Sequence, residues 1–374
     1  MIRIFLTGDN HIGLKYASHE RASVLSSARL TAFEGMVSAA NEAGCGLFVI
    51  AGDLFENTYG VPKRDVKSLV GMLEGFRGTV AVLPGNHDYY DSDVKVWQYF
   101  GDCAGSADNI VLMKEYRPYR LSLGEDEAVL YPAMCTSMHS APGENNLGWI
   151  KRAEIDGGCF NIGIAHGALE GETIDTEGQY FLMTRRELED IPLDLWLLGH
   201  THVPFPELGT EFAASGRIFN AGTHVQTDVA CNCAGQCFII ELADDKSVRA
   251  KRIDSGTLRF CRKHIRLSPG NMRSQLEREL SALGDGSVVD LVLSGAVTDE
   301  EYAGRAELLD GMLGRFIEGT YNDSALSRLI SPELIDSEFA ETSFAAHFLK
   351  ALLDEPKEAQ LAYELLKSLE EGKR

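Results

Sequence analysis

The chain has no excess of positive charge. Lys and Arg total 35 residues against 56 Asp and Glu, which gives a formal net charge of −21. Nonspecific nucleic-acid binding depends on Lys and Arg that neutralise phosphates, so this balance argues against a protein that passively coats DNA. It does not exclude an enzyme that acts on nucleic acid, because bound dications can be the largest positive charges in a site.

Long apolar runs and a dense set of cysteines are also missing. No stretch reaches the roughly 18 apolar residues of a membrane span, and the apolar opening run stops at Asp9, too early for the core of a signal peptide. Eight cysteines among 374 residues, without a secretory signal, indicate mostly reduced thiols. We therefore expect a cytoplasmic protein that does not associate with a membrane.

The first half of the chain alternates short β-rich runs with helical patterns, which is typical of an α/β fold. The pattern predicts strands over 2–7, 47–51, 79–83, 160–165 and 193–198, and helices over 21–43 and 63–76. The β-rich stretch 217–266 is expected to form a second sheet that closes the core.

The second half suggests two further parts. Pro269-Gly270 marks a boundary, after which helical spacing, a strand over 288–293 and a capping box at Thr298–Glu301 predict a small α/β unit. Beyond about residue 332 the pattern is helical only, with an apolar stripe that begins at Phe344. We expect three parts: 1–266, a small α/β domain over 267–331 and a C-terminal helical segment over 332–374.

Polar clusters follow the predicted strands of the first part. They are Gly8-Asp9-Asn10-His11, Gly52-Asp53, Gly85-Asn86-His87-Asp88, His166 and Gly199-His200-Thr201-His202. Ligands in open α/β sheets bind outside the carboxyl ends of strands, so these clusters are expected to converge.

The clusters contain the side chains that two-metal hydrolysis requires. Such a centre needs hard oxygen and imidazole ligands and a carboxylate that bridges two cations about 3.5 to 4 Å apart. Asp9 and His11 are two positions apart, so both can face the same side of an extended strand end. Asp53 could bridge, and Asn86 adds a neutral oxygen. The sequence therefore predicts hydrolysis of phosphoester bonds with two metal ions.

This series of motifs resembles the calcineurin-like metallophosphoesterases. Within that superfamily, Asp9-Asn10-His11-Ile12-Gly13 and Gly52-Asp53-Leu54-Phe55 are most similar to the SbcD-type DNA repair exonucleases. The resemblance covers about residues 1–260 and implies a two-sheet metallophosphoesterase sandwich flanked by helices. It extends more loosely over the unit after 269, which stands where that family carries a DNA-capping domain.

The resemblance also implies roles for single residues. One metal would be bound by Asp9, His11, Asp53 and His202, and the other by Asp53, Asn86, His166 and His200. His87 would be catalytic, facing the scissile phosphate without binding metal. The metal ions would be Mn²⁺, which suits the mixed oxygen and nitrogen ligands.

The implied function is that of a manganese-dependent DNA exonuclease and endonuclease, the nuclease subunit of a DNA repair complex. Its partners would be DNA and an SbcC-type coiled-coil ATPase held by the C-terminal helices. A homodimer would form through helices near 62–76 and 92–101.

One residue departs from the family pattern, and the roles of some others are undecided. Some family members have a His three residues after the bridging Asp, where this chain has Glu56. His224 is a candidate substrate-side residue, although a loop histidine without a role is the commoner case. The basic stretch 246–266 is a candidate DNA-backbone strip, although solvated strand faces are more common.

The cysteines allow a second metal hypothesis. Together with Cys261, the residues Cys231, Cys233 and Cys237 could supply four thiolates to zinc, but their spacing favours buried or incidental thiols.

Two other functions compete with the DNA nuclease. The same metal core could serve a phosphodiesterase or phosphatase that acts on nucleotides or small phosphoesters. A protein phosphatase is disfavoured because 52–57 lacks the Arg-Gly found there in such enzymes. A non-enzymatic scaffold that regulates the ATPase is disfavoured by the complete set of ligands.

Overall fold

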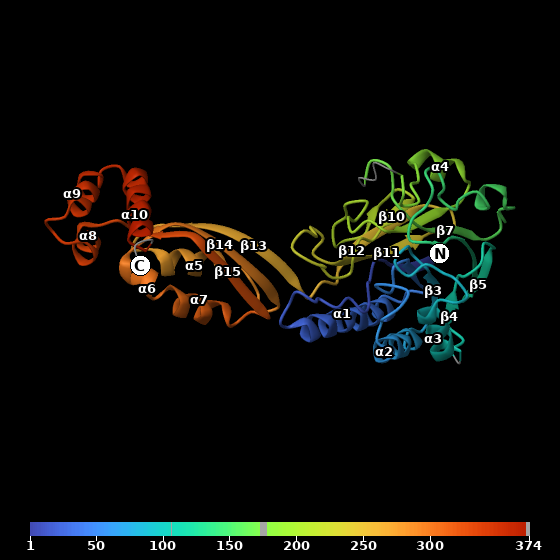
Figure 1. Cartoon of the computed structure of the whole chain (residues 1–374). Helices are drawn as coiled ribbons and strands as arrows, with labels where there is room; N and C mark the ends of the chain where they lie inside the picture. Colours follow the sequence, from blue (N-terminus) through green and yellow to red (C-terminus); the bar gives the residue numbers. More distant parts are fainter. Residues whose placement is uncertain (106, 173–177, 372–374) are drawn as a thin grey trace. The chain divides into compact units, whose positions relative to one another are not determined.

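The computed structural model describes residues 1–105, 107–172 and 178–371. The chain forms two compact units, Met1–Arg259 and Phe260–Arg374 (Figure 1). The division into three parts stays a prediction. In the described part of the chain, no helix is both long and apolar enough to cross a membrane.

The first unit is built on two sheets. The seven-stranded sheet has the order β4-β3-β2-β1-β11-β12-β9, and the five-stranded sheet has the order β10-β8-β7-β6-β5. The strands are β1 (Ile2–Thr7), β2 (Leu47–Ala51), β3 (Thr79–Leu83), β4 (Ile110–Leu112), β5 (Tyr119–Leu123), β6 (Asp126–Ala133), β7 (Phe160–His166), β8 (Leu195–Gly199), β9 (Ala213–Ala214), β10 (Ile218–Asn220), β11 (Gln236–Leu242) and β12 (Val248–Asp254). The expected two-sheet α/β fold is confirmed.

Helices flank the sandwich, and apolar cores lie on both faces of each sheet. The helices are α1 (Ala22–Glu42), α2 (Lys63–Glu74), α3 (Lys95–Ala104), α4 (Arg185–Asp190) and the 3₁₀ turn η1 (Ile150–Arg152). Strand β2 illustrates the packing: Leu47 and Val49 enter the core between the sheets, whereas Phe48 and Ile50 enter the core beneath the helices. A strand buried on both faces is therefore continuously apolar instead of alternating.

The stretch 217–266 does not form the second sheet as predicted. Only β10 of the stretch 217–266 joins the five-stranded sheet, whereas β11 pairs antiparallel with β1, with Ile4 opposite Ile240. The reason is that β11 is apolar on both faces, with Phe238 in one core and Ile239 in the other. Such a strand is stable in the middle of a sheet, so it extends the first sheet.

The second unit has its own sheet, with the order β13-β14-β15. Its strands are β13 (Arg259–Leu267), β14 (Ser287–Val297) and β15 (Glu318–Arg328), and its helices are α5 (Met272–Leu280), α6 (Asp299–Ala303), α7 (Arg305–Leu313), α8 (Pro332–Glu338), α9 (Phe344–Ala351) and α10 (Pro356–Glu371). The capping box at Thr298 and Glu301 is confirmed. Helices α8, α9 and α10 share a separate small core around Ile335 and Leu349.

Glycines allow the two sheets of the first unit to approach closely at one edge. A Cβ atom on Gly52 would lie 2.0 Å from His166 Nδ1, and one on Gly199 would lie 2.0 Å from the Ala51 carbonyl oxygen. Gly52 also has a φ of +94°, which other residues rarely adopt. The ends of β2, β7 and β8 therefore meet, and the polar clusters that follow them come together.

Candidate metal centre

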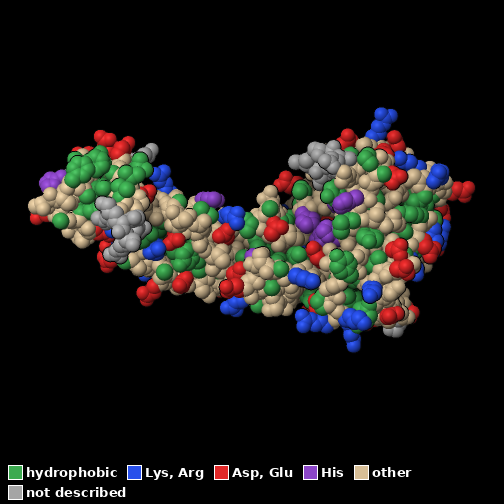
Figure 2. Space-filling model, in the orientation of Figure 1, with side chains coloured by type: hydrophobic (Ala, Val, Ile, Leu, Met, Phe, Trp, Pro, Cys, Tyr) green, Lys and Arg blue, Asp and Glu red, His purple; other side chains and the backbone are tan. Residues whose placement is uncertain are grey.

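The loops after β1, β2, β3, β7 and β8 bring the polar clusters into one site. Asp9, Asp53, Asn86, His166 and His11 are each at most 3% exposed. His200 and His202 are partly exposed at its mouth, and Figure 2 shows histidine side chains gathered in a hollow of this surface. All seven residues predicted as ligands thus meet in the structure.

One group of ligand atoms comes from Asp9, His11 and His202, whose atoms all lie within 4.8 Å of one another. The Nε2 atoms of His11 and His202 face each other at 3.1 Å. Two imidazole nitrogens at this distance suit a shared proton or a shared cation. A second group forms around Asn86, whose Oδ1 lies 3.0 Å from both His166 Nε2 and His200 Nδ1.

Asp53 lies between these two groups. Its Oδ2 is 3.3 Å from His166 Nε2 and 3.9 Å from His11 Nε2. Its Oδ1 accepts a hydrogen bond of 2.8 Å from the His87 backbone N–H, which fixes the rotation of the carboxylate. One oxygen is thus directed towards both groups, which is the geometry that a bridging carboxylate requires.

The backbone of the site is strained. Asp9, His11 and Asp53 have φ angles of 45° to 49°, and His200 has a φ of 108°. Positive φ at a residue other than glycine costs on the order of 1–3 kcal/mol and persists only where the surroundings hold it. Here the backbone N–H groups of Asp9 and His11 donate to the carbonyl oxygens of Gly52 and Asp53.

Two further buried side chains hold these loops. Asp88 accepts hydrogen bonds from the N–H groups of Gly85 and Phe55 at 2.7 and 2.9 Å, and so joins the loops after β2 and β3. Arg29 on α1 is 1% exposed and donates to the Asn10 carbonyl oxygen at 2.6 Å. Neither residue was predicted from the sequence to have a role. Asp88 stands beside the predicted His87, but nothing in the sequence singled out Arg29.

Burial and neighbouring charge shift the acid–base properties of the site. Burial raises the pKa of Asp9 to about 6. Burial also acts to raise the pKa of Asp53, but the cationic His166 outweighs it and holds that pKa below its usual range. Burial lowers the pKa of His166, but the Asp53 and Asp9 carboxylates prevail and raise it to about 9. A divalent cation bound by Asp53 and His166 would compete with a proton for the same side chains.

The donor set fits divalent cations. It combines two buried carboxylates, one amide oxygen and four imidazoles, which is the hard and borderline mixture that suits manganese, iron or zinc. Within the described residues, the ion-pair partners of Asp53 are His11 and His166, whereas Asp9 accepts a hydrogen bond of 3.0 Å from the His200 backbone N–H. Neither carboxylate pairs with Lys or Arg in this part of the chain. Two carboxylates buried together in this way are stabilised by a cation between them.

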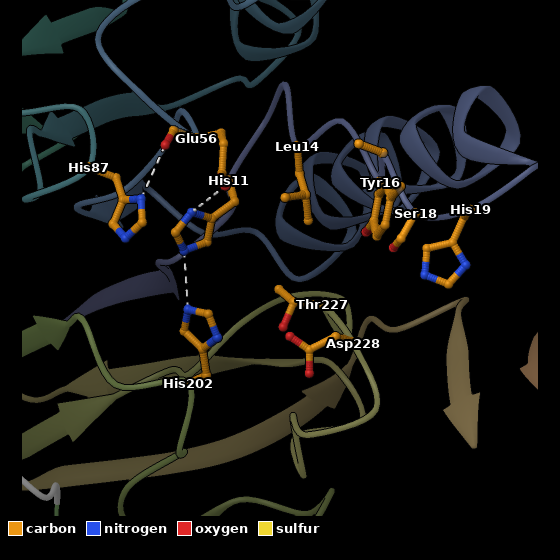
Figure 3. Close-up of a pocket in the computed structure, with 11 residues that line it drawn as sticks. His11, Leu14, Tyr16, Ser18, His19, Glu56, His87, His202, Thr227 and Asp228 are labelled. Carbon is orange, nitrogen blue, oxygen red and sulfur yellow. Dashed lines mark hydrogen bonds and ion pairs between the residues drawn. The ribbon is translucent and has the colours of Figure 1, made fainter. Parts of the chain in front are cut away.

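His87 lines a cavity of about 390 Å³ at the mouth of the site, together with His11, His202 and Glu56 (Figure 3). Its Nδ1 lies 3.1 Å from the Glu56 carbonyl oxygen. If Nδ1 donates to that carbonyl, Nε2 is the nitrogen left for substrate. His87 also lies within 4.8 Å of ligand atoms of His11 and Asp53, so its predicted role without metal stays a prediction.

His224 is placed away from the cavity. It is fully buried, and its Nε2 lies 3.2 Å from the Arg29 carbonyl oxygen. Its ring meets Phe33 edge-on with the centroids 6.0 Å apart. This packing against α1 argues against contact with substrate and favours the alternative of a structural histidine.

The cysteines form no thiolate cluster among the described residues. The Cys237 thiol faces Met36 and Ser255, whereas Cys233 faces the Thr223 carbonyl oxygen. Burial raises the pKa of Cys237 to about 12, which disfavours the thiolate that zinc needs. Buried thiols are therefore the better interpretation.

The basic stretch 246–266 is largely neutralised by ion pairs. Lys246 pairs with Asp194, Arg249 with Glu241, Arg252 with Asp254, Arg262 with Asp290 and Lys263 with Glu279. Cations that are already paired neutralise phosphates less well. Solvated strand faces explain the stretch better than a DNA-backbone strip.

A two-sheet α/β sandwich that gathers carboxylates, an amide and imidazoles at the ends of its strands defines a metal-dependent hydrolase. The model of the calcineurin-like phosphoesterase family matches residues 2–204, more than half of the chain. The chain belongs to this family, whose members hydrolyse phosphoesters.

Solved structures with a similar arrangement include two phosphatases. A dimetal phosphatase from Danio rerio is 11% identical with a TM-score of 0.35, and the match covers 67% of this chain and 98% of that one. A purple acid phosphatase from yellow lupin seeds is 13% identical with a TM-score of 0.30, over 54% of this chain and 38% of that one. No curated protein matches the chain.

Removal of one imidazole tests the metal centre. His200→Ala is expected to lower the bound metal per chain and to weaken Mn²⁺ binding by at least about tenfold, since loss of an inner ligand costs at least as much as loss of an outer partner. Equilibrium dialysis followed by elemental analysis measures both. His264→Ala, which changes an exposed histidine of β13, is the control. Unchanged metal content in His200→Ala would remove His200 from the ligand set.

Proposed function

We propose that this chain is a manganese-dependent nuclease that cleaves DNA phosphodiester bonds as an exonuclease and endonuclease, and that it serves as the nuclease subunit of a DNA repair complex. The observation that carries this proposal is the position of Asp53 Oδ2 between two groups of ligands, 3.3 Å from His166 and 3.9 Å from His11. The motif resemblance to SbcD-type exonucleases supports DNA as the substrate.

The proposal assigns a role to each side chain. Asp9, His11, Asp53 and His202 would hold one cation, and Asp53, Asn86, His166 and His200 the other. Two bound dications would supply an activated water and neutralise the charge that develops on the phosphate. His87, which lines the cavity, would stabilise the phosphate or protonate the leaving oxygen.

One observation favours a smaller substrate. Among the described residues that line the cavity, none is Lys or Arg, and Glu56 and Asp228 contribute carboxylates. A polymer presents many phosphates, each repelled by such walls, whereas a nucleotide or small phosphoester presents few. A phosphodiesterase or phosphatase of small substrates is therefore the second candidate.

A comparison of two substrates separates these functions. The purified chain is incubated with Mn²⁺ and either end-labelled linear duplex DNA or bis(4-nitrophenyl) phosphate, with EDTA as the control. The proposal expects shortening of the DNA that EDTA abolishes. Turnover of the aryl diester with intact DNA would instead establish the small-substrate enzyme.

The His87→Ala variant tests the catalytic assignment. We expect it to keep both metal ions and to lose about 10²- to 10⁴-fold in single-turnover cleavage, which is typical for removal of one positioned acid or charge-stabilising group. Elemental analysis beside the kinetics distinguishes it from His200→Ala, which should lose metal. Missing metal in His87→Ala would make His87 a ligand, and an unchanged rate would remove it from the mechanism.

The C-terminal helices support the proposed partner. Outside the small core of α8, α9 and α10, apolar side chains remain at the surface: Phe344 at 77% exposure, Phe348 at 40%, Leu361 at 67%, Leu365 at 60% and Leu369 at 56%. Figure 2 shows such a hydrophobic area on the segment that carries α9 and α10. We propose that an SbcC-type coiled-coil ATPase covers it, because helices present apolar faces that fit such grooves and coils. A homodimer through α2 and α3 belongs to the same proposal.

A paired substitution tests the ATPase contact without disturbing the small core. Leu361→Glu with Leu365→Glu is expected to weaken binding of the purified ATPase by more than about tenfold, because two buried charges would replace apolar contacts. Val24→Glu, at an apolar residue of α1 that is 42% exposed, is the control. Binding by the double variant at the unaltered affinity, measured by calorimetry, would show that this surface has another role.

A further inference from the structure

Glu56 lies behind a proposed metal ligand. Its Oε2 is 3.0 Å from His11 Nδ1, and its side chain is 26% exposed while that of His11 is 4% exposed. The other ring nitrogen of His11, Nε2, faces His202 Nε2 and the Asp53 carboxylate. The imidazole of His11 thus stands between a carboxylate on one side and the ligand group on the other, as Figure 3 shows for its contacts with Glu56 and His202.

The backbone fixes this arrangement. The His11 and Ile12 N–H groups donate to the Asp53 and Leu54 carbonyl oxygens, and the Glu56 N–H donates back to the Ile12 carbonyl oxygen at 3.1 Å. Ile12 and Phe55 also form a parallel bridge. The two loops are therefore joined residue by residue, and the side chain of Glu56 is held beside the ring of His11.

The chemistry of a neutral imidazole gives this contact a consequence. Only one of its ring nitrogens carries a proton, and the group that accepts that proton decides which nitrogen keeps the lone pair. A carboxylate at Nδ1 accepts a proton there and leaves the lone pair on Nε2. A carboxylate behind a ligating imidazole also fixes the ring orientation and makes the ligand more basic.

His166 shows the contrast within the same site. Its Nδ1 lies 2.9 Å from the Ala51 carbonyl oxygen, so a neutral acceptor orients that ring. An anionic acceptor increases the electron density of the imidazole more than a neutral carbonyl does. The two proposed cation positions therefore differ in the groups that lie behind their histidines.

We propose that Glu56 is a positioning residue that holds His11 as the Nδ1–H tautomer, directs Nε2 towards the cation and strengthens binding at the position shared by Asp9, His11 and His202. This inference rests on the proposed metal centre. It also gives a use to the acidic residue that stands where some related nucleases have a histidine. Since the carboxylate of Glu56 lies 3.0 Å from His11 Nδ1, its part in the cavity wall is to orient a ligand and not to contact phosphate.

Three variants separate the effects of charge and of hydrogen bonding. Glu56→Gln keeps an oxygen acceptor and removes the charge, whereas Glu56→Ala removes both. Asp228→Asn removes a charge from the same cavity, and Asp228 pairs with backbone N–H groups of Ala230 and Cys231 instead of a histidine. Thermal melts check that each variant is folded.

Manganese titration by calorimetry is the first readout. We expect Glu56→Ala to bind one of two Mn²⁺ ions about 10- to 100-fold more weakly, with Glu56→Gln in between and Asp228→Asn unchanged. If Asp228→Asn weakened Mn²⁺ binding equally, the loss of any negative charge in the cavity would explain the effect, and the positioning role of Glu56 would be overturned. Wild-type affinity in Glu56→Ala would overturn it as well.

The tautomer of His11 is the second readout, and a purely structural role would not move it. In histidine-¹⁵N-labelled protein with EDTA, long-range proton–nitrogen spectra should show His11, assigned with His11→Asn, as Nδ1–H in the wild type and Glu56→Gln. Glu56→Ala should lose that pattern. An Nε2–H ring in the wild type would overturn the inference while leaving the metal centre intact. Absence of manganese binding by the wild type would instead overturn the proposed function.

Discussion

The burial of Asp9 and Asp53 side by side is the constraint on which the first unit depends. Two carboxylates removed from water lose hydration and, to a smaller extent, repel one another, which is why the pKa of Asp9 is raised to about 6. The imidazoles of His11 and His166 offset part of this cost, and the cationic His166 keeps Asp53 ionised. A site of this kind favours divalent cations, because a cation between two buried carboxylates offsets their charge more than a proton does.

The surrounding structure holds these groups in an unfavourable geometry. Positive φ angles at Asp9, His11 and Asp53 are sustained by hydrogen bonds between the loops after β1 and β2. Buried Asp88 ties the loop after β2 to that after β3, and buried Arg29 secures Asn10 from α1. Ligand positions are thus preorganised by the fold, so little conformational entropy is lost when cations bind.

The charge of the chain adds a second consequence. The net charge of the chain is −21, and the cavity wall carries two carboxylates. Basic residues of the stretch 246–266 are held in ion pairs, so little positive charge of the protein is left to attract a phosphate. Attraction of an anionic substrate would therefore depend on the cations themselves. In such a site substrate affinity and catalysis are expected to require the same ions, in contrast to enzymes whose Lys and Arg bind phosphate independently.

The sequence by itself determined the strands and the chemistry of the site. Strands β1, β2 and β3 have the predicted bounds, because continuous apolar runs between polar clusters depend on local composition. The meeting of Asp9, Asp53 and Asn86 followed from the rule that parallel strands end at one edge of a sheet. His166 and His200 come from the second sheet, whose close approach depends on Gly52 and Gly199. Tertiary structure decided that β11 pairs with β1. A strand that is apolar on both faces can pair with any buried strand, and its partner is far away in the sequence.

Tertiary structure also decided that His224 packs against α1 and that basic residues of the stretch 246–266 form ion pairs with acidic residues. Burial and charge pairing depend on residues that are distant in the sequence. The position of Glu56 behind His11 is of the same kind. Two loops more than forty residues apart had to be joined before that carboxylate could lie 3.0 Å from the imidazole.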